Sequence, residues 1–132
     1  MGRAIRTEAD ATANAAEHAE RTCASCGRRM PASAAPDAKY CSAACRKHGV
    51  DATDRALEQR IDELLAARSR SSSICPSDAA RALDPDGWRD LMEPARRAAR
   101  RMVARGEVEI TQHGSVVDPS TAKGPIRIRR PR

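Results

Sequence analysis

The sequence predicts a mainly α-helical protein in which a small four-cysteine module precedes a unit of three helices and a β-hairpin. Two observations support this prediction. Two cysteine pairs lie close together in the first half of the chain, and amphipathic helical patterns give way to an alternating strand pattern in the second half. The chain has 132 residues, which is room for one ordinary domain or two small ones. A plain three-helix bundle with a frayed tail is the alternative architecture.

The first segment, residues 1–21, is rich in alanine and glutamate and has almost no large apolar residue. Such a segment cannot bury enough surface to offset the entropy lost on ordering, so we expect a disordered arm or a frayed helix. A cysteine module (22–48) and a helical domain (49–132) follow it. No apolar run is long enough to span a bilayer, and no signal-peptide-like segment is present, so we expect a cytoplasmic protein without membrane contact.

Four cysteines have the spacing of a metal site. Cys23 and Cys26 form a CxxC pair, and three residues separate Cys41 from Cys45. Four thiolates arranged as a tetrahedron are typical of structural zinc sites. We expect Ser42 to cap a short helix that holds Cys45 in its first turn. The four side chains would fill every coordination position, so we predict a structural four-cysteine zinc site with no position open for a substrate.

Other interpretations of the cysteines stay open. A CxxC pair can be a redox centre, and the four thiols can be unrelated buried residues. His48 lies one turn beyond Cys45 and could replace it as a ligand. Tyr40 is expected to shield one side of the cluster. The fifth cysteine, Cys75, is expected to be a small buried core residue.

Three helices are predicted after the module. The first covers residues 54–67, with a leucine and isoleucine face and Asp51 or Thr53 as its N-cap. The second covers residues 77–83 and begins at Ser77. The third starts near residues 91–93, because proline at position 94 is tolerated only in a first turn, and it stops at Gly106.

A hairpin is predicted after the third helix, because an alternating EVEIT strand and a short SVV strand flank a turn centred on His113 and Gly114. Residues 118–124 read as a loop, and the last residues as a short strand or a basic tail. Helix, helix, helix and hairpin is the order of a winged helix-turn-helix, which is the fold that we predict. Trp88 is expected to be largely buried, and the predicted core consists of Leu57, Ile61, Leu64, Leu65, Ile74, Leu83, Leu91, Met102, Val108, Ile110 and Val116.

The third helix has one apolar face and an opposite face made mostly of arginine. In a helix-turn-helix the second helix of the motif enters the major groove, where arginines contact phosphates or guanine edges. With a net charge of +6, this pattern predicts a non-enzymatic nucleic-acid-binding protein, with DNA favoured over RNA. The predicted contacts are Arg89, Arg96, Arg97, Arg100 and Arg101 of the third helix and Lys123, Arg127, Arg129 and Arg130 of the tail.

A solvated arginine face is the competing interpretation, because the predicted hairpin is acidic at Glu107 and Glu109. A protein–protein interaction module with a structural zinc and no nucleic-acid contact is then the alternative function. The sequence contains no nucleophile–base set, glycine-rich phosphate loop or paired carboxylates of the kind that enzymes use. We therefore expect neither an enzyme nor a small-molecule substrate.

Two stretches resemble known families. CASCGRR and KYCSAACRK, within residues 23–47, resemble the short bacterial module called domain of unknown function 2256, whose pattern is CxxCGR followed by KYCSxxCR. ICPSDAARAL, WRDLM and GPIRIR, in that order within residues 64–129, resemble domain of unknown function 3253. These resemblances imply a bacterial protein that joins a zinc-ribbon-like module to a winged-helix-like domain, and they imply no activity. Between its cysteine pairs the chain has MPASAAPDA where the first family carries tryptophans and basic residues.

Overall fold

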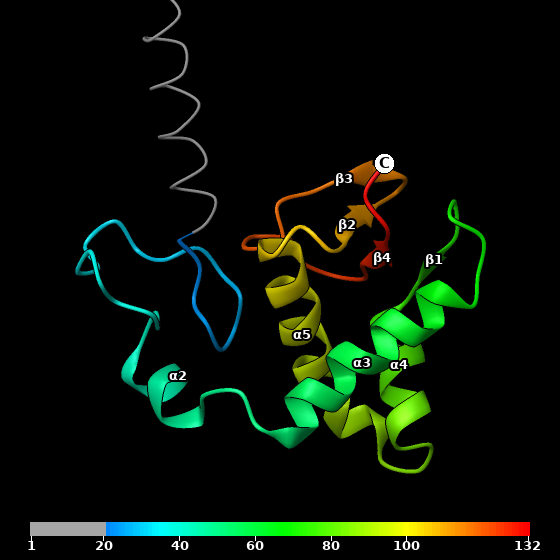
Figure 1. Cartoon of the computed structure of the whole chain (residues 1–132), viewed down its shortest axis with the longest axis horizontal. Helices are drawn as coiled ribbons and strands as arrows, with labels where there is room; N and C mark the ends of the chain where they lie inside the picture. Colours follow the sequence, from blue (N-terminus) through cyan, green and yellow to red (C-terminus); the bar gives the residue numbers. More distant parts are fainter. Residues whose placement is uncertain (1–20) are drawn as a thin grey trace, which may run out of the picture.

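A computed structural model describes residues 21–132, so the arm expected over 1–21 lies outside the described residues apart from Arg21 (Figure 1). The described chain is mostly helical with one small antiparallel sheet. Its helices are α2 (Ala43–His48), α3 (Ala52–Ala66), α4 (Pro76–Leu83) and α5 (Met92–Ala104), and a 3-10 turn, η1 (Trp88–Leu91), precedes α5. Its strands are β1 (Ser73–Ile74), β2 (Glu109–Gln112), β3 (Ser115–Val116) and β4 (Arg127–Arg129).

The ends of α3 and α5 follow local sequence signals. Asp51 caps α3 in a capping box: its carboxylate accepts the Asp54 N–H at 2.8 Å, and the Asp54 carboxylate accepts the Asp51 N–H at 2.9 Å. Helix α5 has Pro94 in its first turn, where the missing N–H costs no hydrogen bond. Gly106, with φ +77°, ends it. These predicted boundaries are confirmed to within about two residues.

The start of α4 differs slightly from the prediction. The helix begins at Pro76, and Cys75 rather than Ser77 is its N-cap. The Cys75 N–H donates to the Asp78 carboxylate at 2.9 Å. Proline fits the first helical position because that N–H needs no partner. Cys75 is consequently half-buried at a helix start, and the prediction that it is a buried core residue is wrong.

The sheet has the order β1-β4-β2-β3, and every pair is antiparallel. Strand β4 lies between β1 and β2, and its Ile128 pairs with Ile74 on one side and Ile110 on the other. The β2–β3 hairpin turns at His113 and Gly114, which both have positive φ, 53° and 84°. That geometry belongs to the tight turns that match strand twist, so the predicted hairpin is confirmed.

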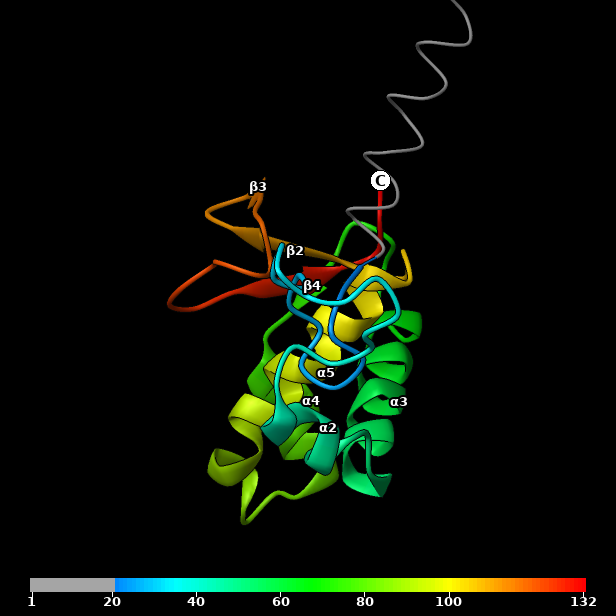
Figure 2. The ribbon, with the colours of Figure 1, turned by 90° about the vertical axis from the view of Figure 1, so that its left-hand side faces the viewer.

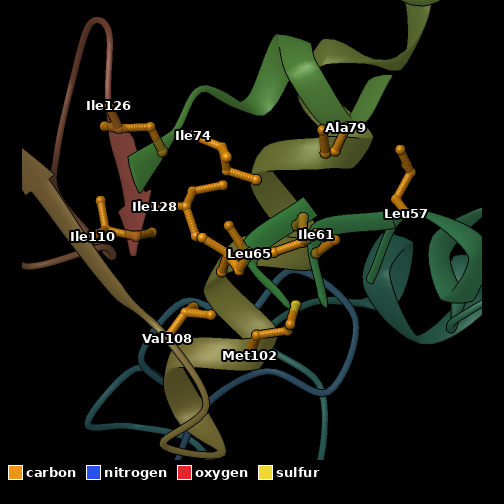
Figure 3. Close-up of a cluster of buried hydrophobic side chains, with 13 residues drawn as sticks. Leu57, Ile61, Leu65, Ile74, Ala79, Met102, Val108, Ile110, Ile126 and Ile128 are labelled. Carbon is orange, nitrogen blue, oxygen red and sulfur yellow. The ribbon is translucent and has the colours of Figure 1, made fainter. Parts of the chain in front are cut away.

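The core lies between the three helices and the inner face of the sheet (Figure 3). Alanines on α4 and α5 are fully buried and let the helices approach closely. The other fully or almost fully buried members come from α3, α5, three strands and the residues directly before β2 and β4: Leu57, Ile61, Leu65, Ile74, Met102, Val108, Ile110, Ile126 and Ile128. The core is therefore shared by helices and sheet, with the C-terminal strand at its centre.

Two predicted core residues, Leu91 and Val116, lie outside the core, and two buried isoleucines were not predicted. Leu91 is half-buried in η1. Val116 is 58% exposed, because it pairs with Thr111 in the edge strand β3 and therefore lies on the face of the sheet opposite Ile110. Ile126 and Ile128 are buried instead: Ile128 lies in β4, which is the short strand expected as one alternative for this segment, and Ile126 directly precedes that strand.

Trp88 is half-buried rather than largely buried. It lies in η1, ahead of the regular turns of α5 that pack on the core. The guanidinium groups of Arg81 and Arg89 lie 4.1 Å and 4.6 Å from the centre of its ring. Trp88 is thus held by cation–π contacts at the rim of the helical domain.

Within residues 21–132, no helix is long and apolar enough to cross a membrane.

Ile128→Ala should lower the free energy of unfolding by about 2–5 kcal/mol, because it opens a cavity at the centre of the sheet. Val116→Ala, which removes an exposed aliphatic side chain from the edge strand, should change it by no more than about 0.5 kcal/mol. Urea denaturation followed by circular dichroism measures both. Equal losses for the two variants would contradict the placement of β4.

Candidate metal centre

Four thiols come together in the cysteine module (residues 22–48). The Sγ atoms of Cys23, Cys26, Cys41 and Cys45 all lie within 4.8 Å of one another. Cys41 lies 3.7 Å from Cys26 and 3.7 Å from Cys45, measured between sulfurs. A tetrahedron of sulfurs at zinc–thiolate bond length has edges of about 3.8 Å. The cluster therefore has the size and the donor set of a site that could hold one metal ion.

Local backbone geometry positions the first pair of thiols. In the knuckle turn, residues 23–27, the Gly27 N–H donates to the Cys23 carbonyl at 2.9 Å, and the Cys26 N–H points at the Cys23 sulfur at 3.4 Å. Gly27 has φ +77°, a conformation that favours glycine. The turn therefore needs a glycine directly after its second cysteine.

The second pair is positioned by α2. Ser42 is the N-cap, and its hydroxyl accepts the Cys45 N–H at 3.1 Å, which confirms the predicted cap and places Cys45 in the first turn. Tyr40, Met30 and Cys41 pack against the three buried cysteines. Tyr40 thus covers part of a cluster that has almost no other apolar neighbours.

The thiols differ in their proton affinity. Burial raises the pKa of Cys41 to about 12, and the neighbouring thiols of Cys26 and Cys45 reinforce the effect. Burial also raises the pKa of Cys23, but backbone N–H groups of Cys26 and Cys41 outweigh it and lower that pKa to about 6. Without a metal, Cys23 thus gives up its proton more readily than Cys41 does. A bound divalent cation supplies the charge that lets all four ionise.

The histidine alternative is not supported by the geometry. His48 Nε2 lies 3.1 Å from the Asp54 carboxylate, at the start of α3. His48 therefore faces the helical domain, and Cys45 completes the group of four.

The knuckle turn lies against α5. Arg100 Nε donates to the Cys26 carbonyl at 2.6 Å, and Arg101 Nη1 donates to the Ser25 carbonyl at 2.7 Å. Arg97 Nη2 donates to the Ser25 hydroxyl. In Figures 1 and 2 the module, blue to cyan, lies along one side of α5. We call Arg97, Arg100 and Arg101 the arginine face of α5.

The contact leaves no room for a side chain at Gly27. A Cβ atom there would lie 2.6 Å from both the Arg100 carbonyl carbon and the Arg101 nitrogen, which are backbone atoms of α5. An ion pair also joins the module to the loop after β3: Arg29 Nη1 lies 2.6 Å from the Asp118 carboxylate. The module and the helical domain have separate apolar clusters, but a polar interface joins them.

Two of the three arginines on this face are buried and the third, Arg97, is half-buried, contrary to our expectation. Arg100 is 6% exposed and Arg101 is 5% exposed. Each also pairs with a carboxylate: Arg100 with Glu93 at 3.0 Å and Arg101 with Glu58 at 2.6 Å. Burial lowers the pKa of Arg100 despite its Glu93 partner. A helical pattern shows that these residues lie off the apolar face, but it does not show what covers them.

The other predicted contact residues divide into two groups. Arg89 is exposed beside Trp88, and Arg96 is half-buried on α5. At the C-terminal end, Arg129 pairs with Glu109 at 3.0 Å and Arg130 with Asp62 at 2.9 Å. Lys123 and Arg127 are exposed there. The structure therefore does not bring the predicted residues into a single surface.

The sequence interpretation missed three participants in this interface: Ser25, Gly27 and Glu58. Gly27 had a usable signal, since glycine directly after a CxxC pair indicates a tight metal-binding turn. No local sequence signal indicated Ser25 or Glu58, because their partner Arg101 lies far from both along the chain.

The described protein is thus a mainly helical chain with a small antiparallel sheet and a four-cysteine cluster suited to a metal ion. A family described as "Protein of unknown function (DUF3253)" matches residues 54–131, and the chain belongs to that family. No curated protein matches the chain. The family match covers α3 to β4 and not the four cysteines, so the resemblance of residues 23–47 to domain of unknown function 2256 stays a prediction.

The purified protein should contain about one zinc ion per chain, because four thiols lie at ligand distance of one another. Cys41→Ser should lose the metal and unfold the module while α3, α4 and α5 keep their helical signal. Elemental analysis and circular dichroism measure these outcomes. A metal-free protein after anaerobic purification would contradict the first expectation.

Gly27→Ala should lower stability by about 1–3 kcal/mol more than Gly49→Ala does, because a Cβ at Gly27 overlaps the backbone of α5. Gly49 is a matched control: its φ is +63° and nothing lies within 4 Å of the new methyl group. Thermal denaturation of the zinc-loaded proteins makes the comparison. Equal effects would show that φ strain alone matters and that the docking does not.

Proposed function

We propose that the protein is a non-enzymatic, zinc-containing nucleic-acid-binding protein of winged-helix architecture. The order of its elements supports the architecture: helix, strand, helix, helix, then strands in which β4 pairs with both β1 and β2. In this reading α5 is the second helix of the helix-turn-helix, and the β2–β3 hairpin belongs to the wing.

Zinc is the metal that the donor set favours. Four cysteine thiols at tetrahedral spacing suit a borderline-soft ion without redox chemistry. The four cysteines would fill every coordination position, which leaves no site for a substrate or an activated water. The metal then has a structural role, which supports a binding protein rather than an enzyme.

The observation that carries nucleic-acid binding is a cluster of arginines without acidic partners at the C-terminal end. Arg127 donates to the Ser73 carbonyl at 2.9 Å, and Arg132 donates to the Ser71 carbonyl at 2.9 Å. Arg68 precedes the serine turn, residues 69–72, and Arg70 lies within it. Within the described chain none of these four arginines pairs with a carboxylate. We call Arg68, Arg70, Arg127 and Arg132 the basic end surface.

Carbonyl partners hold a guanidinium in place without neutralising its charge. The basic end surface therefore keeps its positive charges, and serine hydroxyls in the same turn add further donors to phosphate oxygens. Contacts of this kind bind nucleic acid without reading its sequence directly.

A protein partner is the second candidate function, and one observation favours it. β3 is an edge strand of the sheet and exposes Val116. An edge strand offers unpaired backbone groups to an extended peptide. Binding of that kind would depend little on salt, in contrast to phosphate binding.

Binding to random duplex DNA and to RNA should weaken steeply as salt rises. Replacing Arg70, Arg127 and Arg132 by alanine should reduce the slope of log K against log salt by about one unit per lost phosphate contact. Replacing Arg46, Lys47 and Arg55, which lie outside the basic end surface, removes the same charge and should change the slope much less. Fluorescence anisotropy at several salt concentrations measures the slopes.

Equal slopes for the two triple variants would show a general effect of net charge, and the basic end surface would have no special role. Absence of binding by the zinc-loaded parent to either nucleic acid at low salt would favour the protein-partner function.

A further inference from the structure

The knuckle turn that would hold the metal is also the cover of the arginine face. Ser25 and Cys26 supply all the hydrogen-bond acceptors that the arginine face has on the module. They accept from Arg97, Arg100 and Arg101. Ser25 lies between the ligands Cys23 and Cys26, and Gly27, whose backbone touches α5, follows the second of them. The backbone that meets the arginines is thus fixed by the same two thiols that would bind the metal.

The module has little besides a metal to keep it folded. Its buried cluster contains only Cys23, Cys26 and Cys45, with Met30, Tyr40 and Cys41 packed beside them. Its one helix, α2, has six residues. Segments of fewer than about 40 residues rarely fold without a metal, disulfides or a partner. Loss of the metal should therefore melt the knuckle turn.

Helix α5 has an independent reason to stay folded. Its apolar residues, Ala95, Ala98, Ala99 and Met102, belong to the core shared with α3 and the sheet. None of them belongs to the apolar cluster of the module. Melting of the module would uncover the arginine face while α5 remains in place.

One hydrogen-bond donor at the contact between the module and α5 is unsatisfied. Arg97 Nε is buried and has no hydrogen-bond partner among the described residues. A buried donor without a partner destabilises the docked state relative to one in which water reaches it. Arg97 also forms no ion pair with a carboxylate in the described chain, so no acidic partner neutralises its charge once the module leaves.

We propose that the arginine face of α5 is a second, latent phosphate-binding surface, which the metal-loaded module covers and which loss of the metal uncovers. The proposal rests on the proposed function for its partner, a nucleic-acid backbone. After release, Arg100 and Arg101 keep Glu93 and Glu58 as partners. Arg96 and Arg97 on the same helix have no acidic partner within the described residues, so the uncovered surface is cationic.

The cover is tested first without nucleic acid. The full-length, zinc-loaded protein and the same protein after chelation are treated with an arginine-selective dicarbonyl, and modified residues are located by mass spectrometry. Arg100 and Arg101 should be protected with zinc and modified after chelation, whereas exposed Arg55 should react in both states. Continued protection after chelation, or loss of the α5 helical signal, would overturn the proposal.

A variant at Gly27 tests whether docking of the module protects the arginines independently of zinc binding. Gly27→Ala, which crowds the docked turn against α5, should increase modification of Arg100 and Arg101 while zinc stays bound. Gly49→Ala should leave both protected. Equal protection in the two zinc-loaded variants would count against the proposed cover.

Nucleic-acid binding then tests the surface. Chelation should steepen the salt slope of the parent by about one unit, because Arg97 is the member of the arginine face without a carboxylate partner, and the variant Arg97→Ala should show no such change. Unchanged binding of the parent after chelation would overturn the latent surface while leaving binding through the basic end surface intact. Binding seen only after chelation would sustain the latent surface and remove the role of the basic end surface.

Discussion

The contact between the knuckle turn and α5 is the interaction on which the arrangement of this protein depends. Two units with separate apolar clusters meet there through carbonyl groups and guanidinium groups, not through a common apolar core. The carbonyls are fixed by the turn between Cys23 and Cys26, and the guanidiniums are fixed by a helix anchored in the other unit. Gly27 allows the two backbones to touch. A small displacement of the knuckle turn or of α5 would therefore weaken the hydrogen bonds at this contact.

The polar character of the contact explains why it holds buried arginine. A buried guanidinium is costly unless its donors are satisfied. Arg101 meets this requirement with the Ser25 carbonyl, the Asp54 carbonyl and the Glu58 carboxylate. Asp54 is also part of the capping box of α3, and its carboxylate faces His48 at the end of α2. The same few residues thus start α3, orient the end of the module and hold α5.

Local chemistry made part of this protein predictable. The capping box of α3, the glycine after α5 and the His113–Gly114 turn are signals contained within a few residues, and the four-cysteine cluster followed from spacing in the same way. Non-local contacts were not predictable. Ile128 became central only because β4 inserts between β1 and β2, which left Val116 at an edge. The burial of Arg100 depends on its contact with Cys26, 74 positions away in the sequence. The hydrophobic pattern of a helix does not predict a contact over that separation.

Charge links the metal to the arginine face in a further way. Four thiolates around one divalent cation carry a formal charge of about −2, and this charge would lie next to Arg97, Arg100 and Arg101. Without a cation, the thiols of Cys26 and Cys41 hold their protons more tightly than usual, because burial raises the pKa of both. Loss of the metal would therefore melt the turn, as proposed above, and would also reduce the negative charge beside the arginines. Since both changes act in the same direction, docking of the module and metal binding should stabilise each other.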